Sequence, residues 1–296
     1  MAAALDEPTS ALLVSAERAL AAEFPAAAQA RTVLSAIGSG ERTFTNIGHK
    51  AGDLQQTSLN RSLKLLLDKR VVEQDQPLSV KPAAKDKRYR VADPYLRFWL
   101  AFLGPHMAEV ERGRGDRVLA RIQASWTSWR GRAIEPLLRE ALDRVLVERP
   151  PLGEGVVGEY WTRTNDPEID IVVADRHPVA GRILGVESIK WLERAPFGRR
   201  DLARLVVHRC QLPGATDNTP LIVVARSGCT VDRGHCVRAR RPAARLAPSA
   251  QLTTETYAGA VAPTIARQAR RALTAPLGGA LSSSDVCRRG RYWKIK

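Results

Sequence analysis

Two runs of β-branched residues separated by a turn constrain the fold of this chain more than any other feature. They lie in the segment PEIDIVVADRHPVAGRILGVESIKW (167–191), as Ile169–Val173 and Ile183–Ile189. Such runs, bounded by Pro and Gly, are typical of neighbouring strands. Each run carries an acid, and Lys190 closes the second. We therefore expect paired strands with acids and a lysine on them.

The surrounding sequence places these strands in a mixed sheet. A long amphipathic helix (SWTSWRGRAIEPLLREALDRVL) precedes them, and the strand-like segment VVGEYWTR comes next. After the two runs follow a helical segment, RRDLARLVVHRCQL, and another strand, PLIVVAR. Helix, three strands, helix and strand together predict an α/β domain over residues 125–231.

The first part of the chain has a different order of elements. Residues 26–37 and 46–50 have helical patterns, and a third helix over 54–70 follows Asp53, which we expect to cap it. Its leucines at 59, 63 and 66 predict a buried stripe. Short strands at 71–73 and 87–91 complete a winged helix-turn-helix over residues 26–93. The predicted fold class is therefore mixed α+β.

A winged helix suggests DNA as the partner. The third helix would enter the major groove, while basic residues of the wing reach phosphates. The groove residues would be Asn60, Arg61 and Lys64, and the phosphate contacts Lys85, Lys87, Arg88 and Arg90. The alternative is a helical unit that contacts proteins and whose charges are only a solvated face.

The flanking segments are less informative. Residues 1–25 read as short alanine-rich helices without a partner, similar to the end of a domain that is missing. Asp93 and Pro94 form a helix start, and residues 94–124 hold a cluster of aromatic residues, which predicts bridging helices between two domains.

Charge separates the tail from the rest. The chain of 296 residues has 46 Lys and Arg against 31 Asp and Glu, a net charge of +15. Residues 232–296 hold 13 of these cations and 3 of these acids. We expect a basic, poorly ordered tail that attracts polyanions. It resembles a product of a shifted reading frame.

Other classes have little support in the sequence. No run approaches the ~20 apolar residues of a membrane span, and no signal pattern is present, so we expect a cytoplasmic protein without a membrane partner. The four cysteines lack C-x-x-C spacing, which favours free thiols over zinc or disulfides.

Several sequence blocks, in this order, resemble a known family. They are AEFP, LSAIGSGERTFTNIGHKAG, SLNRSLKLLLDKRVV, KRYRVADPYLRFWLAF, WRGRAIEPLLREAL, PEIDIVVA and SIKW. Together they resemble the C-terminal half of the archaeal-type ATPases, which occur also in actinobacteria, over roughly residues 1–231. That family joins a P-loop ATPase domain, a winged helix and a domain of unknown function 234, which looks like the restriction-endonuclease fold.

The chain departs from that family in two ways. It has no G-x-x-x-x-G-K-[ST] loop, so we expect no ATP site of its own and infer that an ATPase domain or protein could act in trans. The tail after Cys229 does not resemble the family either.

The resemblance implies a nuclease site. Asp170 matches the first acid, Lys190 the lysine and Glu135 an acid on the preceding helix, and such sites hold Mg²⁺. The position two before Lys190 is Ser188, whereas the nearest acid is Glu187. Because strand side chains alternate, Glu187 should face away from Lys190, towards solvent, unless a bulge at Gly185 rotates it.

We therefore interpret the nuclease site as degenerate and the protein as a DNA-binding module without a cofactor. Two alternatives stay open. One is a Mg²⁺-dependent endonuclease that uses Asp170, Glu187 and Lys190, with the two acids as metal ligands. The other is an interaction module or truncated remnant without catalytic activity.

Overall fold

The computed structural model describes residues 1–25, 28–83, 85–146, 155–231 and 236–238. These residues form a mixed α+β structure, as predicted, in two compact units. The first, here called the helical unit, holds Met1–Gln76 and Ala84–Trp129. The second, the sheet unit, holds Pro77–Ala83 and the chain from Arg130 onward.

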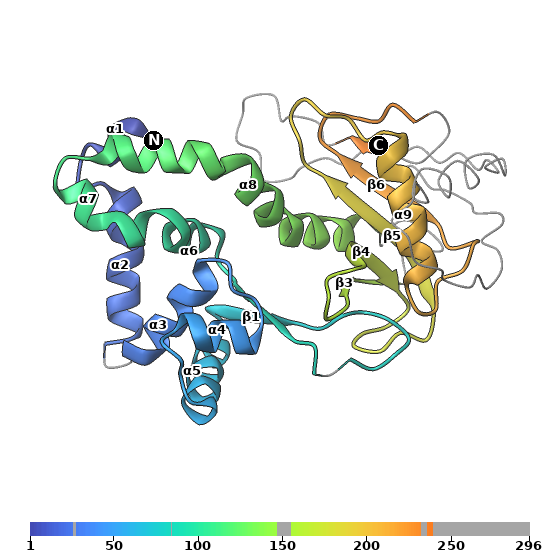
Figure 1. Cartoon of the computed structure of the whole chain (residues 1–296), viewed down its shortest axis with the longest axis horizontal. Coiled ribbons are helices and arrows are strands. Elements are labelled where there is room, and N and C mark those ends of the chain that lie inside the picture. Colours follow the sequence, from blue (N-terminus) through green and yellow to red (C-terminus); the bar gives the residue numbers. More distant parts are fainter. Residues whose placement is uncertain (26–27, 84, 147–154, 232–235, 239–296) are drawn as a thin grey trace, which may run out of the picture. The chain divides into compact units, whose positions relative to one another are not determined.

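The helical unit contains three helices followed by a hairpin (Figure 1). The helices are α3 (Ala28–Gly38), α4 (Phe44–Lys50) and α5 (Gln56–Asp68), and the antiparallel strands are β1 (Val72–Asp75) and β2 (Arg88–Val91). The leucines at 59, 63 and 66 of α5 are 1%, 2% and 0% exposed, which confirms the predicted stripe. Burial of this stripe holds α5 against the other helices and leaves its opposite side to solvent.

Two expectations for this unit were wrong. Gln55, and not Asp53, is the N-cap of α5, whereas Asp53 has φ 54° and its carboxylate lies 2.7 Å from Nδ1 of His49. An aspartate tolerates this left-handed backbone because its short polar side chain can bond locally. The N-terminal helices α1 (Ala2–Leu5) and α2 (Ala11–Glu23) also have partners, since the Trp99 indole donates to the carbonyl of Leu13 at 2.7 Å.

The aromatic segment belongs to the core of the helical unit. Asp93 caps α6 (Pro94–Phe98) by accepting from the Leu96 amide at 2.6 Å, so the Asp-Pro helix start is confirmed. A π-helical turn (Trp99–Leu103), a 3-10 turn (Gly104–His106) and α7 (Met107–Glu111) follow. Rings of this segment pack on tryptophans of α8 (Gly115–Leu146), with 5.6 Å between the centroids of Phe98 and Trp129.

The sheet unit contains a mixed sheet in the order β3-β4-β5-β6-β7. Its strands are β3 (Val156–Trp161), β4 (Glu168–Ala174), β5 (Ile183–Lys190), β6 (Leu221–Ala225) and β7 (Cys236–Arg238). β3, β4 and β5 are antiparallel, whereas β6 runs parallel to β5 after the crossover helix α9 (Arg199–Gln211). This is the order of helix, strands, helix and strand that the sequence predicts.

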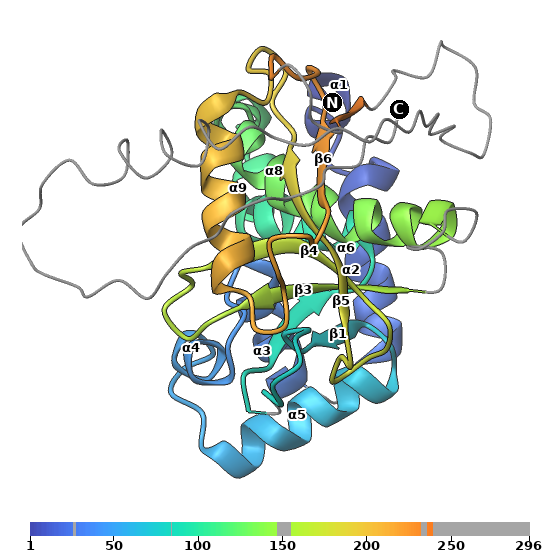
Figure 2. The same cartoon turned by 90° about the vertical axis from the view of Figure 1, so that its right-hand side faces the viewer.

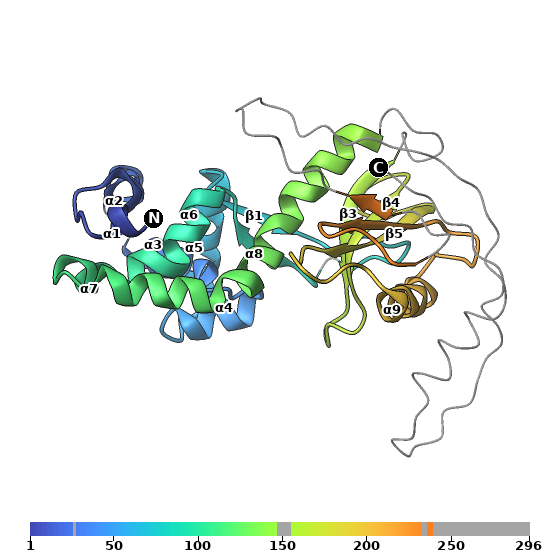
Figure 3. The same cartoon turned by 90° about the horizontal axis from the view of Figure 1, so that it is seen from above.

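Each face of the sheet is covered by one helix. Figures 2 and 3 show α9 along one face, and Figure 3 shows the second half of α8 on the other. Leu138 and Leu142 of α8 pack with Ile171 and Ile222, whereas Leu205 of α9 belongs to the core on the opposite face. The two faces therefore have separate apolar cores, and the buried apolar side chains of β4 and β5 are divided between them.

The loop of the hairpin contributes to the sheet unit. Leu78 is 0% exposed, and its amide donates to the carbonyl of Glu159 at 2.7 Å. The amide of Ala180 donates to the carbonyl of Ser79 at 3.0 Å. The tip of the predicted wing is therefore a structural part of the sheet unit and is not available as a free DNA-contacting loop.

Three further expectations concern the rest of the chain. The poorly ordered tail lies outside the described residues, apart from Cys236–Arg238, which form β7. Among the described residues, no helix is both long and apolar enough to cross a bilayer. Cys210 and Cys229 are each in a disulfide bond, so the expectation of free thiols was wrong for these two.

Candidate functional site

Asp170 occupies an irregular position on β4. The pairing of β3 with β4 shifts register between Gly158 and Tyr160, opposite the stretch from Ile169 to Val172. The β4–β5 ladder ends at the pair Ile171 and Glu187, and the Asp170 carboxylate then accepts from the amide of Ile189 at 2.9 Å. The Asp170 side chain therefore replaces a backbone partner where the two strands separate.

Glu187 lies inside the sheet unit and not on its surface. It is 0% exposed, so the expectation of a solvent-facing side chain was wrong. Its register partners are Ile171 on one side and Ile222 on the other, and both belong to the core under α8. Neither carboxyl oxygen of Glu187 has a hydrogen-bond partner among the described residues. A buried carboxylate without partners is costly, so burial favours the protonated form of this group.

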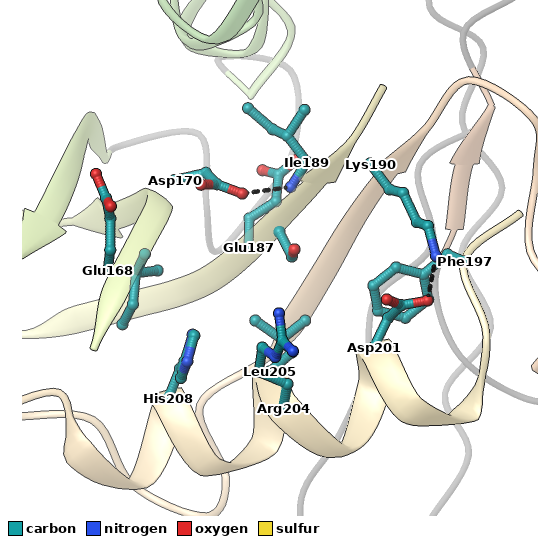
Figure 4. Close-up of a pocket in the computed structure, with 12 residues that line it drawn as sticks. Glu168, Asp170, Glu187, Ile189, Lys190, Phe197, Asp201, Arg204, Leu205 and His208 are labelled. Carbon is teal, nitrogen blue, oxygen red and sulfur yellow. Dashed lines mark hydrogen bonds and ion pairs between the residues drawn. The ribbon is translucent and has the colours of Figure 1, made fainter. Parts of the chain in front are cut away.

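The two acids influence each other. Figure 4 shows the carboxyl groups of Asp170 and Glu187 on the same side of β5. Burial raises the pKa of Glu187 well above its ordinary value, and the charge of Asp170 raises it further. Burial also raises the pKa of Asp170 to about 6, although the hydrogen bond from Ile189 opposes this change. Both shifts favour the protonated forms, so the two carboxyl groups titrate as a coupled pair.

Lys190 faces the other side of the sheet. Its Nζ lies 2.6 Å from the carboxylate of Asp201 on α9, which also accepts from the amide of Gly198 at 2.8 Å (Figure 4). Glu187 and Lys190 are three residues apart, so strand alternation directs them to opposite faces. A register shift does occur next to Gly185, between the pairs Val173–Gly185 and Ala174–Ile183. It does not bring Glu187 to the face of Lys190.

The helical acid Glu135 does not complete a metal site. It is partly buried on α8, one turn before Arg139. Arg139 pairs with Glu159 at 3.2 Å and donates to the carbonyl of Asp170 at 3.3 Å. Within the described part of the chain, no three His, Cys, Asp or Glu side chains are grouped so that they could hold a metal ion.

These residues do not fit Mg²⁺. The ion keeps several water ligands in octahedral geometry, whereas the Glu187 side chain is 0% exposed. One carboxylate oxygen of Asp170 accepts a hydrogen bond from the amide of Ile189, and Lys190 is ion-paired with Asp201 on the opposite face. Asp170, Glu187 and Lys190 all line one cavity, but the Lys190 ammonium is directed to Asp201 and away from the two carboxyl groups.

The predicted groove residues have a clearer placement. Asn60, Arg61 and Lys64 are all exposed, on the side of α5 opposite its buried leucines. None of the three side chains has a hydrogen bond or ion pair with another described residue. Gln56 and Thr57 are exposed at the start of the same helix. α5 thus presents a polar, cationic surface with unused donors.

The predicted phosphate contacts of the wing are less available. Arg90 is ion-paired with Glu73 and, at 2.9 Å, with Asp75 across the hairpin. Arg88 is only 5% exposed and has a partner of its own. Lys85 is exposed and Lys87 is partly exposed. Cross-strand ion pairs thus neutralise Arg90, one of the residues that the sequence predicted to contact DNA phosphates.

Sequence reasoning missed three polar residues on α9. Asp201, Arg204 and His208 line the same cavity as Lys190 and the acids of β4 and β5, Glu168, Asp170 and Glu187. Their spacing of three and four residues places them on one helix face, and this signal was present in the sequence. The spacing alone could not show that these residues line a cavity, because the cavity forms only where α9 packs against β5.

Comparisons with known proteins agree with part of the resemblance. Residues 99–199 match the family model of domain of unknown function 234, described as archaea bacterial proteins of unknown function. The uncharacterized protein MJECL04 of Methanocaldococcus jannaschii is 24% identical over 196 residues, which cover 66% of this chain and 43% of that protein. The chain therefore spans less than half the length of this relative. No solved structure matches the chain.

Proposed function

We propose that the helical unit binds duplex DNA by inserting α5 into the major groove. The observation that carries this proposal is the exposed set of Asn60, Arg61 and Lys64, which lack partners within the described chain. α4 and α5, joined by a short turn and followed by a hairpin, form the helix-turn-helix and wing arrangement that presents a recognition helix. Arg, Lys and Asn are the side chains that contact phosphates and base edges most directly.

Helix α5 is expected to contact base edges and phosphates, and two lysines of the wing are expected to contact phosphates only. Asn60 can make a bidentate contact with adenine, whereas Arg61 and Lys64 can bind guanine or phosphate. Lys85 and Lys87 can add phosphate contacts, whereas Arg90 is ion-paired across the hairpin and Arg88 is buried. An ATPase domain or protein in trans is a proposed further partner, which the resemblance alone suggests.

The test is a comparison of two variants with the same charge. Asn60→Ala/Arg61→Ala/Lys64→Ala removes the surface of α5, and Arg18→Ala/Arg112→Ala removes two exposed cations elsewhere in the helical unit. Both variants are made in a chain that ends at Arg238, so that the cationic tail does not mask the effect. Fluorescence anisotropy with a labelled duplex should show at least a tenfold loss of affinity for the first variant and little change for the second. Equal losses would indicate that only net charge matters, and no loss would support a protein-interaction module.

The endonuclease alternative makes a separate prediction. The wild-type chain and its Asp170→Ala variant are incubated with supercoiled plasmid and Mg²⁺. We expect no cleavage above background from either protein, because Glu187 is enclosed and Lys190 faces the other way. Cleavage by the wild type that disappears in the variant would overturn the degenerate interpretation and restore the enzyme.

A further inference from the structure

The start of α9 and the loop before it carry a set of exposed arginines. Arg199, Arg200 and Arg204 lie on the helix, and Arg194 lies in the loop that joins β5 to α9. All four residues are exposed, and none makes a hydrogen bond or an ion pair with another described residue. These four residues are here called the arginine patch.

The acids in this stretch of the chain do not neutralise the arginine patch. Between residues 193 and 204 the sequence contains two acids, Glu193 and Asp201. Glu193 is ion-paired with Arg226 at 3.0 Å. The Asp201 carboxylate lies 2.6 Å from the Lys190 ammonium. Both acids are therefore engaged by cations outside the patch, and the patch keeps its positive charge on the surface.

The positions of these arginines on the helix do not favour the stability of α9. Arg199 and Arg200 occupy its first turn, where the positive end of the helix dipole is unfavourable for cations. Arg200 and Arg204 are four residues apart, and like charges at this spacing also destabilise a helix. The fold alone thus gives no reason for arginine at these positions, whereas an anionic partner would remove both unfavourable effects.

We propose that the arginine patch contacts the phosphodiester backbone of a nucleic acid, independently of base sequence. All four cations of the patch are arginines, and a guanidinium group pairs with phosphate through two parallel N–H···O bonds, which an ammonium group cannot do. The net charge of +15 for the whole chain also favours a polyanion as partner. The patch lies in the sheet unit, so it does not depend on the groove contact proposed for α5.

The test is the salt dependence of binding to a labelled duplex, in the full chain and in the chain that ends at Arg238. Arg200→Gln/Arg204→Gln removes two charges of the patch. The control, Arg176→Gln/Arg182→Gln, removes two exposed charges from the turn between β4 and β5 of the same unit. The logarithm of the binding constant is plotted against the logarithm of the salt concentration. The patch variant should lower the magnitude of the slope by about 2, since each phosphate contact contributes about 0.9, and the control should leave it unchanged. An unchanged slope for the patch variant, or an equal decrease for the control, would overturn the proposal.

A combined variant separates this surface from α5. Arg200→Gln/Arg204→Gln is added to Asn60→Ala/Arg61→Ala/Lys64→Ala, and the patch substitutions should lower the slope in this background as well. If α5 makes no groove contact, the substitutions on α5 alone leave binding unchanged while those on α9 still lower the slope. If the patch makes no contact, only the substitutions on α5 weaken binding, and the proposal is wrong.

Two further measurements distinguish other roles of the same arginines. Urea unfolding should give the same or a higher midpoint for Arg200→Gln/Arg204→Gln than for the unmutated chain, because the substitutions remove charges that are unfavourable to α9. A lower midpoint would show that these arginines serve the fold and would contradict the proposal. Polyglutamate serves as a probe for an acidic protein partner. If the substitutions weaken binding of polyglutamate but not of the duplex, the patch fits an acidic protein segment and the proposal is overturned.

Discussion

Glu187 shows how one position along a strand decides the chemistry of a site. An acid at position 188 would lie on the same face of β5 as Lys190, because side chains alternate along a strand. At 187 it enters the apolar core under α8, where Ile171 and Ile222 flank it. There it has no hydrogen-bond partner among the described residues, and only the raised pKa makes its burial tolerable.

This burial predicts that Glu187→Gln stabilises the protein at neutral and alkaline pH. The folded-state pKa of Glu187 is raised, so the unfolded chain ionises first, near 4.5, and stability falls as pH rises above that value. The neutral amide removes this penalty but keeps the size of the side chain. Urea unfolding at pH 4 and pH 8 should show a variant whose midpoint exceeds that of the wild type only at the higher pH.

The control is Glu140→Gln, which changes an exposed acid on α8. It should shift the midpoint little at either pH, since exposed ion pairs contribute little. If Glu187→Gln lowers stability at pH 8, the carboxylate must be ionised and hold a partner, and the assignment of a buried neutral acid would be wrong.

Asp170 should titrate in an accessible range. Its pKa of about 6 lies above the ordinary value of 3.8, and this shift corresponds to roughly 3 kcal/mol at most of unfavourable burial of the charge. The sign is the same as for Glu187, so Asp170 also reduces stability as pH rises from about 4 to about 6. Carboxyl ¹³C shifts followed through pH 4–8 should show this midpoint, and a midpoint below 4 would contradict it.

At the scale of elements, the hairpin loop is the least expected feature. Pro77–Ala83 belongs to the sheet unit, where Leu78 packs into the core on the α9 face. Glycine at 158 is required for this contact, because a Cβ atom there would lie 2.8 Å from Cδ2 of Leu78. The loop thus takes part in the stability of the sheet unit, although the hairpin strands belong to the helical unit.

Because Leu78 packs into the core of the sheet unit, we expect Leu78→Ala to lower the stability of that unit strongly. Removing a fully buried leucine side chain should destabilise the sheet unit by about 2–5 kcal/mol. Lys81→Ala, which changes an exposed residue of the same loop, should have almost no effect. Urea unfolding followed by hydrogen exchange at β3 measures both. Equal stability of Leu78→Ala and wild type would show that the loop does not hold the sheet unit together.

The sequence predicted the elements well but not their long-range contacts. The bounds of β4 and the buried stripe of α5 follow from local periodicity, which depends on neighbouring residues only. The burial of Glu187, the docking of Leu78 and the cavity beside Arg204 depend on which elements meet, and periodicity contains no such information. Strand alternation did predict that Glu187 and Lys190 lie on opposite faces of β5. It did not predict that a helix covers each face of the sheet.

At the scale of the whole molecule, charge is distributed unevenly. The chain has a net charge of +15, and residues 232–296 contain 13 of its 46 cations. A cationic tail binds any polyanion by releasing counterions, whatever the folded units do. Retention of the complete chain on DNA is therefore weak support for a specific surface on α5.

The measurement that tests the central claim most directly is the salt dependence of duplex binding by a chain that ends at Arg238, after β7. The logarithm of its binding constant is plotted against the logarithm of the salt concentration, with and without Arg61→Ala/Lys64→Ala. If α5 lies in the groove, the unmutated chain binds, and the substitutions reduce the magnitude of the slope by about 2, since each phosphate contact contributes about 0.9. Absence of binding by the shortened chain, or a slope that the substitutions leave unchanged, would contradict the account.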